Sequence, residues 1–155
     1  MNPIPAEIFL KSIRALFTET FDQSHGIYLD RGTSLFETLN TITAETASIP
    51  VSATCATLAA QVEHTAFYID VLIRYITGDP PRNVDWGDIW NRVSAVTPEE
   101  WEASKGRLKE NYQKLVTVTD GLSWESENHV NGVIAVIGHT AYHLGEIRQA
   151  LCTLR

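Results

Sequence analysis

The segment TPEEWEASKGRLKENYQKLVTVTD, residues 97–120, shows most clearly how this chain folds. Thr97 can cap a helix, Pro98 suits the first helical position, and Glu100 can reach back to the cap as in a capping box. Apolar and small residues then recur at steps of three and four, the spacing of one helix face, until Gly121 ends the pattern. The segment predicts a long helix whose inward face carries Trp101, Ser104, Leu108, Tyr112, Leu115 and Thr119.

The rest of the chain repeats this helical periodicity, and the strict alternation typical of strands is nearly absent. The sequence therefore predicts an all-α protein in which helices joined by loops form a bundle. Four further helices are expected at about Ala6–Asp22, Thr33–Thr46, Thr54–Thr77 and Val130–Leu154. The inward face expected for the first of these carries Ile8, Phe9, Ile13, Leu16, Phe17 and Phe21.

A connection of about 20 residues separates Gly78 from Thr97, which is long for a compact domain. It suggests either a short hidden helix or a functional loop. Trp86 and Trp90 within it are four residues apart, so a single helical turn would place both indoles on one side. They are interpreted either as a lid over the end of the core, which we favour, or as candidate residues of a ligand pocket or cofactor-binding wall.

Composition and charge limit the classes of function. The 155 residues include 12 Lys and Arg against 19 Asp and Glu, a net charge of −7, and 44% are hydrophobic. We expect one globular domain over residues 1–155, large enough to fold without disulfides, and no binding to nucleic acid or membranes. The two cysteines, Cys55 and Cys152, form no CxxC pair and are interpreted as reduced. With no signal-peptide pattern and no long apolar run, we expect a cytoplasmic protein.

Three histidines have positions that can be related to one another. His139 and His143 are four residues apart on a predicted helix, about 40° around its axis and about 6 Å along it, so both imidazoles can reach one ion. His64 lies in an apolar helix and should be partly buried, where it needs a hydrogen-bond partner or a metal. Each signal alone fits an ordinary core or surface histidine. Together they predict a three-nitrogen site for one divalent metal, with an open position for water or substrate.

The remaining candidate groups contribute less to this site. His25, in a glycine-flanked turn, and His129 are expected in solvent, and both cysteines are expected on helix faces away from the histidines. Glu146 is the best candidate for a catalytic carboxylate, although a partner for a histidine or a surface glutamate fits its position better. Tyr142 can donate a hydrogen bond to a substrate or pack between helices.

The residues Gly138–Leu151, GHTAYHLGEIRQAL, together with Gln61–His64, QVEH, resemble the DinB/YfiT-like superfamily of metalloenzymes. The resemblance extends loosely from about Thr33 to the C-terminus. It implies a four-helix bundle, to which the helix before Asp22 would be an addition. It also implies one divalent metal ion, zinc or nickel, held by the same three histidines.

The activities implied by this resemblance are diverse. Some members are similar to S-transferases or isomerases that use low-molecular-weight thiols, and others to hydrolases. We therefore expect a metal-dependent enzyme acting on a small-molecule substrate by activating a thiol or water, with thiol transfer slightly favoured because no carboxylate lies between His139 and His143. The alternatives are a noncatalytic metal-binding or small-ligand-binding protein and a metal-free bundle. A homodimer remains open, and metal occupancy is expected to fall as pH drops through about 6.

Overall fold

The computed structural model describes residues 4–154, and within them the secondary structure is entirely helical. This confirms the all-α prediction. None of these helices is both long and apolar enough to cross a membrane. The elements are α1 (Ala6–Phe17), the π-helix η1 (Thr18–Asp22), α2 (Leu35–Leu39), α3 (Ala44–Ala47), α4 (Leu58–Ile76), α5 (Asp88–Arg92), α6 (Pro98–Asp120) and α7 (Glu127–Leu154).

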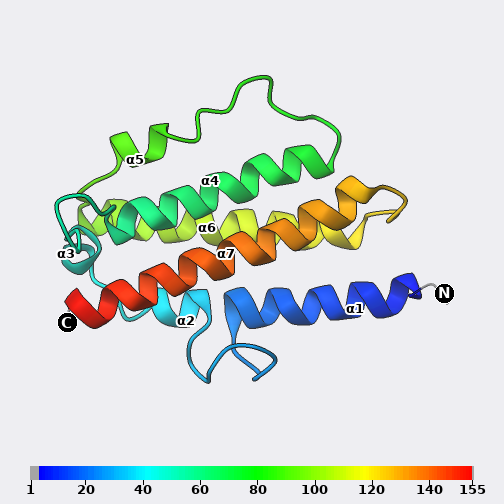
Figure 1. The fold of residues 1–155 in the computed structure, drawn as a ribbon, viewed down its shortest axis with the longest axis horizontal. Coiled ribbons are helices and arrows are strands. Elements are labelled where there is room, and N and C mark those ends of the chain that lie inside the picture. Colours follow the sequence, from blue (N-terminus) through cyan, green and yellow to red (C-terminus); the bar gives the residue numbers. More distant parts are fainter. Residues whose placement is uncertain (1–3, 155) are drawn as a thin grey trace.

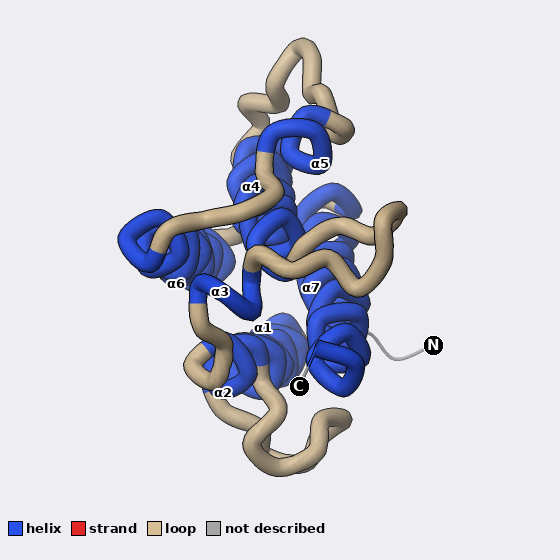
Figure 2. Tube along the Cα trace, turned by 90° about the vertical axis from the view of Figure 1, so that its left-hand side faces the viewer, coloured by secondary structure: helices blue, strands red, loops and turns tan. Residues whose placement is uncertain are grey.

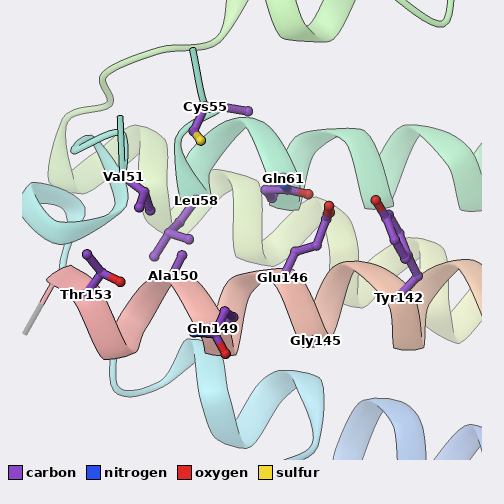
Figure 3. Close-up of a pocket in the computed structure, with 11 residues that line it drawn as sticks. Val51, Cys55, Leu58, Gln61, Tyr142, Gly145, Glu146, Gln149, Ala150 and Thr153 are labelled. Carbon is purple, nitrogen blue, oxygen red and sulfur yellow. The ribbon is translucent and has the colours of Figure 1, made fainter. Parts of the chain in front are cut away.

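The four long helices α1, α4, α6 and α7 lie side by side around one hydrophobic core (Figure 1). Seen along their length in Figure 2, α4 and α1 lie opposite one another, and α6 and α7 fill the two places between them. The connection that contains α5 runs along the outside of α4. Near the start of α4, side chains from α4, α7 and the preceding loop border a groove (Figure 3).

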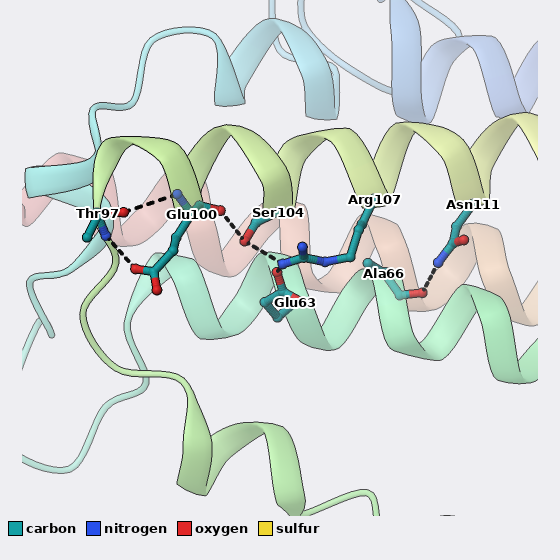
Figure 4. Close-up of polar contacts among 7 residues, drawn as sticks. All are labelled: Glu63, Ala66, Thr97, Glu100, Ser104, Arg107 and Asn111. Atoms are coloured by element: carbon teal, nitrogen blue, oxygen red, sulfur yellow. Dashed lines mark hydrogen bonds and ion pairs between the residues drawn. The ribbon is translucent and has the colours of Figure 1, made fainter.

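Helix α6 begins as the sequence predicts. The Glu100 backbone N–H donates to Thr97 Oγ1, and the Thr97 N–H donates to the Glu100 carboxylate at 2.7 Å (Figure 4). Every residue expected on its inward face is buried. Trp101 is almost completely enclosed, and its indole N–H donates to the carbonyl of Ile42 at 2.9 Å, which ties α6 to the segment between α2 and α3.

The single helix predicted at Thr33–Thr46 is wrong, because the structure has two short helices there. Helix α2 stops with Asn40 as its C-cap, and α3 starts from Thr43, whose hydroxyl accepts from the Thr46 N–H. Asparagine and threonine side chains compete with a continuous helix by capping its ends. The break between the two helices leaves the carbonyl of Ile42 free to accept the indole N–H of Trp101.

Helix α1 is not an addition outside the bundle but part of the core. Phe17 is buried and its ring contacts that of Tyr112 on α6, while Arg14 forms an ion pair with Asp120 at 2.7 Å. The inward face expected for this helix is wrong at Ile8, which is 58% exposed. The helix therefore occupies one of the four long positions, which the short α2 and α3 could not fill.

The loop after η1 is organised by one carboxylate. Glu19 is fully enclosed and accepts hydrogen bonds from successive backbone N–H groups. The donors are His25, Gly26, Ile27, Tyr28 and Leu29. Burial alone would raise the pKa of the Glu19 carboxyl, but these N–H bonds favour the charged form and hold the pKa below its ordinary value. A side chain thus satisfies backbone groups in a stretch that lacks regular secondary structure.

Candidate metal centre

The candidate centre lies where the middle of α4 meets α7. His64 projects from α4, and His139 and His143 project from successive turns of α7. One ring nitrogen from each lies within 4.8 Å of the others, and His64 Nε2 is 3.2 Å from His139 Nε2. Two imidazole nitrogens on a tetrahedral zinc ion are about 3.3 Å apart, given zinc–nitrogen distances of about 2.0–2.1 Å. The first pair is therefore already at the spacing of ligands, and the ligand nitrogen of His143 lies within 4.8 Å of both.

His143 presents a free nitrogen to this centre. Its Nδ1 lies 2.5 Å from Gln61 Oε1 and 2.8 Å from Glu146 Oε2. Because both neighbours accept hydrogen bonds, Nδ1 carries the proton and Nε2 is left with its lone pair. This Nε2 is buried and has no hydrogen-bond partner. A buried, unpartnered acceptor is costly, and a metal ion would satisfy it, so the donor set fits a divalent ion.

Aromatic rings position the other two imidazoles. Tyr68 stacks on His139 with ring centroids 3.5 Å apart and planes 16° apart. Trp90 stacks on His64 with centroids 4.3 Å apart and planes 29° apart. The Nδ1 of His64 is buried without a hydrogen-bond partner, so this ring is oriented by stacking.

The two tryptophans of the long connection do not share one helical turn. Helix α5 begins at Asp88, after Trp86, so only Trp90 lies within it. Trp86 instead contacts the rings of Phe67 and Tyr68, with centroids 5.8 and 5.6 Å away. A short helix is present in the connection. The indoles of Trp86 and Trp90, however, contact different residues of α4. Trp90 lines the cavity that opens beside His143, in line with the pocket alternative. Whether either tryptophan binds a cofactor stays a prediction.

All three imidazoles have lowered pKa values, which favour the neutral form at pH 7. Burial, assisted by repulsion between the neighbouring rings, lowers the pKa of His64 and of His139 from 6.5 to about 4. Burial also lowers the pKa of His143, although the Glu146 carboxylate opposes this shift. Neutral imidazole is the form that binds metals, so the site does not have to lose protons before binding at neutral pH.

A cavity of about 520 Å³ opens beside His143. Glu146 lines it and is half-buried, with one oxygen engaged by His143 Nδ1. Tyr142 also lines it and is 61% exposed, so it does not pack between helices. Figure 3 shows the Glu146 side chain pointing from α7 toward Gln61 of α4, with the Tyr142 side chain beside them on α7. A hydrogen bond from the Tyr142 hydroxyl to the Glu146 carboxylate raises the pKa of that hydroxyl. Catalytic roles for Glu146 and Tyr142 stay predictions.

The acidic neighbour of His64 is engaged elsewhere. Glu63 forms an ion pair with Arg107 of α6, and Asn111 donates to the Ala66 carbonyl at 2.9 Å one turn further along (Figure 4). These contacts hold α4 against α6. They also leave Glu146 as the carboxylate beside the histidine group, among the described residues that line the cavity.

The other histidines and Cys152 lie away from the centre, whereas Cys55, expected on a helix face away from the histidines, lines the cavity beside His143. His25 is exposed, as expected, but His129 is half-buried because α7 begins at Glu127, earlier than predicted. Cys55 and Cys152 are free and exposed. Cys55 lies in the loop before α4 and not on a helix face, because the hydroxyl of Thr57 caps the first turn and starts the helix after it.

Sequence reasoning selected the three histidines from helical spacing and burial. It also named Glu146 as a partner for a histidine, which its contact with His143 confirms, but it missed Gln61 and the stacked aromatic rings. Gln61 precedes His64 by almost one turn and shares its face, which was the available signal for its contact with His143. The stacking of Tyr68 has no such local signal. Comparisons of the chain with family models, with curated proteins and with solved structures find no match, so this site is interpreted from its own geometry.

Proposed function

We propose that His64, His139 and His143 bind one divalent metal ion, zinc or nickel, and that the protein is a metal-dependent enzyme of the DinB/YfiT-like type. The observation that supports this proposal is the convergence of two buried imidazoles and one half-buried imidazole, all with lowered pKa values, on one point beside a cavity. Three protein ligands leave a tetrahedral ion with one open position, the arrangement typical of catalytic zinc.

The residues around the centre favour thiol transfer over hydrolysis. A divalent ion in this position lowers the pKa of a bound thiol or water and supplies a nucleophile at neutral pH. Hydrolysis also benefits from a general base within reach of the water. Glu146 already accepts from His143 Nδ1 and from the Tyr142 hydroxyl, so its first role is to orient the imidazole. Thiol transfer would need no such base, because a metal ion held by the three histidines would lower the pKa of the thiol.

The experiment compares metal binding and turnover in matched variants. Protein stripped with a chelator is reloaded with zinc or nickel and assayed with chlorodinitrobenzene plus a low-molecular-weight thiol, and with nitrophenyl esters. We expect thiol-dependent turnover that requires the metal and is lost in His143→Ala. The His25→Ala variant, which removes an exposed imidazole, should keep both metal and activity.

Three outcomes separate the alternatives. Turnover of esters without a thiol would replace thiol transfer by hydrolysis. One bound metal per chain with no turnover of either substrate class would overturn the enzyme proposal and leave a noncatalytic metal-binding protein. Absence of bound metal by elemental analysis would overturn the proposal entirely.

A further inference from the structure

A mostly apolar groove of about 770 Å³ runs along α7 beside the candidate metal centre (Figure 3). This volume is within the range of pockets that hold small organic ligands. One wall is α7, and the other is formed by the start of α4 and the loop before it. The residues that line it are Val51, Cys55, Ala56, Leu58, Gln61, Tyr142, Gly145, Glu146, Gln149, Ala150 and Thr153.

The groove is continuous with the cavity at the histidines. Residues that line both spaces include Gln61, Tyr142 and Glu146, together with Cys55 and Ala56 of the loop. Because Gln61 and Glu146 also contact His143, a molecule lying in the groove would have one end beside the metal ligands. The rest of that molecule would extend toward the C-terminal end of α7.

The groove changes in polarity along its length. Near the histidines its walls carry the amide of Gln61, the hydroxyl of Tyr142 and the carboxylate of Glu146. Farther along α7 the lining is formed by aliphatic side chains such as Val51, Leu58 and Ala150, together with the uncharged polar side chains of Gln149 and Thr153. Leu58 is only 1% exposed, whereas Val51 leaves its side chain 36% exposed at the rim. An apolar molecule would cover the carbon atoms that are still exposed here, such as those of Val51, and gain from their removal from water.

Charge further restricts the occupant. Among the residues that the structure describes, none that lines the groove is Lys or Arg, and Glu146 is the charged residue in the lining. Arg148, although nearby in sequence on α7, lines a different cavity, and its guanidinium lies 3.4 Å from Thr38 Oγ1. An anionic group in the aliphatic part would therefore lose its hydration without finding a cation.

We propose that this groove binds the uncharged, apolar body of the substrate and places its reacting end at the histidines. The reaction itself rests on the proposed function, whereas binding of the apolar body depends on the groove alone. The substrate class is thus a neutral compound with an aliphatic or aromatic body, and compounds with a carboxylate or phosphate on that body are excluded.

The test uses the uncharged fluorescent probe N-phenyl-1-naphthylamine, titrated into zinc-loaded and metal-free protein. We expect saturable binding in both forms. Ala150→Phe fills the groove and should weaken binding by about tenfold, equivalent to losing two buried methylene groups. Val51→Asp places a charge at the exposed rim, where refolding is not at risk, and should weaken binding similarly. Ile134→Phe enlarges an exposed side chain of α7 outside the groove and should change nothing.

Competition defines the charge class. The competition uses metal-free protein, so that the carboxylate of decanoate cannot bind to zinc at the histidines. Decanol should displace the probe at lower concentration than decanoate. Equal displacement, or a preference for decanoate, would overturn the inference. So would probe affinity unchanged in both Ala150→Phe and Val51→Asp.

Zinc titration of the same samples separates the two proposals. Normal zinc binding without saturable probe binding would overturn the inference about the groove and leave the metal centre intact. Probe binding that responds to the groove variants, without zinc binding, would overturn the proposed metal enzyme and support the groove as a site for apolar ligands.

Discussion

Zinc affinity should fall by no more than about 30-fold between pH 7 and pH 5, because burial lowers the pKa of each ligand. An imidazole with the ordinary pKa of 6.5 weakens metal binding about 25-fold over this interval through competition with protons, and three such ligands weaken it about 15,000-fold. His64 and His139, with pKa values of about 4, together weaken it only about 1.2-fold. His143, whose pKa is also lowered, adds at most about 25-fold.

The expected loss of affinity is therefore about 30-fold or less, and the decline lies below the pH of about 6 indicated by the sequence alone. Isothermal titration calorimetry of metal-free protein with zinc at pH 7, 6 and 5 measures this directly. The His25→Ala variant is the matched control, because it removes an exposed imidazole and leaves the centre unchanged. A loss of more than about a thousandfold would show that the imidazoles titrate like ordinary histidines and would refute the argument from burial.

Three further predictions concern single residues. Saturating zinc at 100 times its dissociation constant should stabilise the 155-residue protein by about 2.7 kcal/mol, or about 8 °C in Tm, and His143→Ala should abolish this shift while helical circular dichroism is retained. Trp90→Ala should weaken zinc binding about 2- to 10-fold, because it removes the ring stacked on the His64 imidazole. Trp90→Phe should keep most of the affinity. Equal zinc affinity in Trp90→Ala and the unmodified protein would contradict the orienting role of Trp90. Gly132→Ala should destabilise the protein by about 1–3 kcal/mol in urea unfolding, because the new Cβ would lie 2.6 Å from Ile76 Cγ1, whereas Gly138→Ala on the same helix, with open space around it, should stabilise by about 0.5–1 kcal/mol.

The parts of the fold that local sequence determines were predictable. The capping box at Thr97 and Glu100 depends only on residues within one helical turn, and α6 begins there. The same holds for the closeness of His139 and His143, which follows from helix geometry. The break after Asn40 was missed, because the spacing of the apolar residues fits one longer helix as well as two short ones. The signal for the break is Thr43, whose hydroxyl caps the second helix.

What depends on contacts between distant segments was predicted incompletely. Burial of His64 could be inferred from its apolar helix, but its orientation depends on Trp90, which lies on another element. The enclosure of Glu19 by the following loop could not be predicted from a sequence pattern. The donors are backbone N–H groups, which almost every residue type carries. The place of α1 in the core likewise depends on contacts with distant helices. These contacts decide whether α1, or the segment that contains α2 and α3, packs as the fourth helix beside α4, α6 and α7.

X-ray absorption spectroscopy of the protein loaded with one equivalent of zinc tests the central claim most directly. The account predicts a zinc ion with three imidazole nitrogens at about 2.0–2.1 Å and one further light atom. A sulfur ligand at about 2.3 Å, or a spectrum of fully hydrated zinc, would contradict the assignment of the ion to His64, His139 and His143.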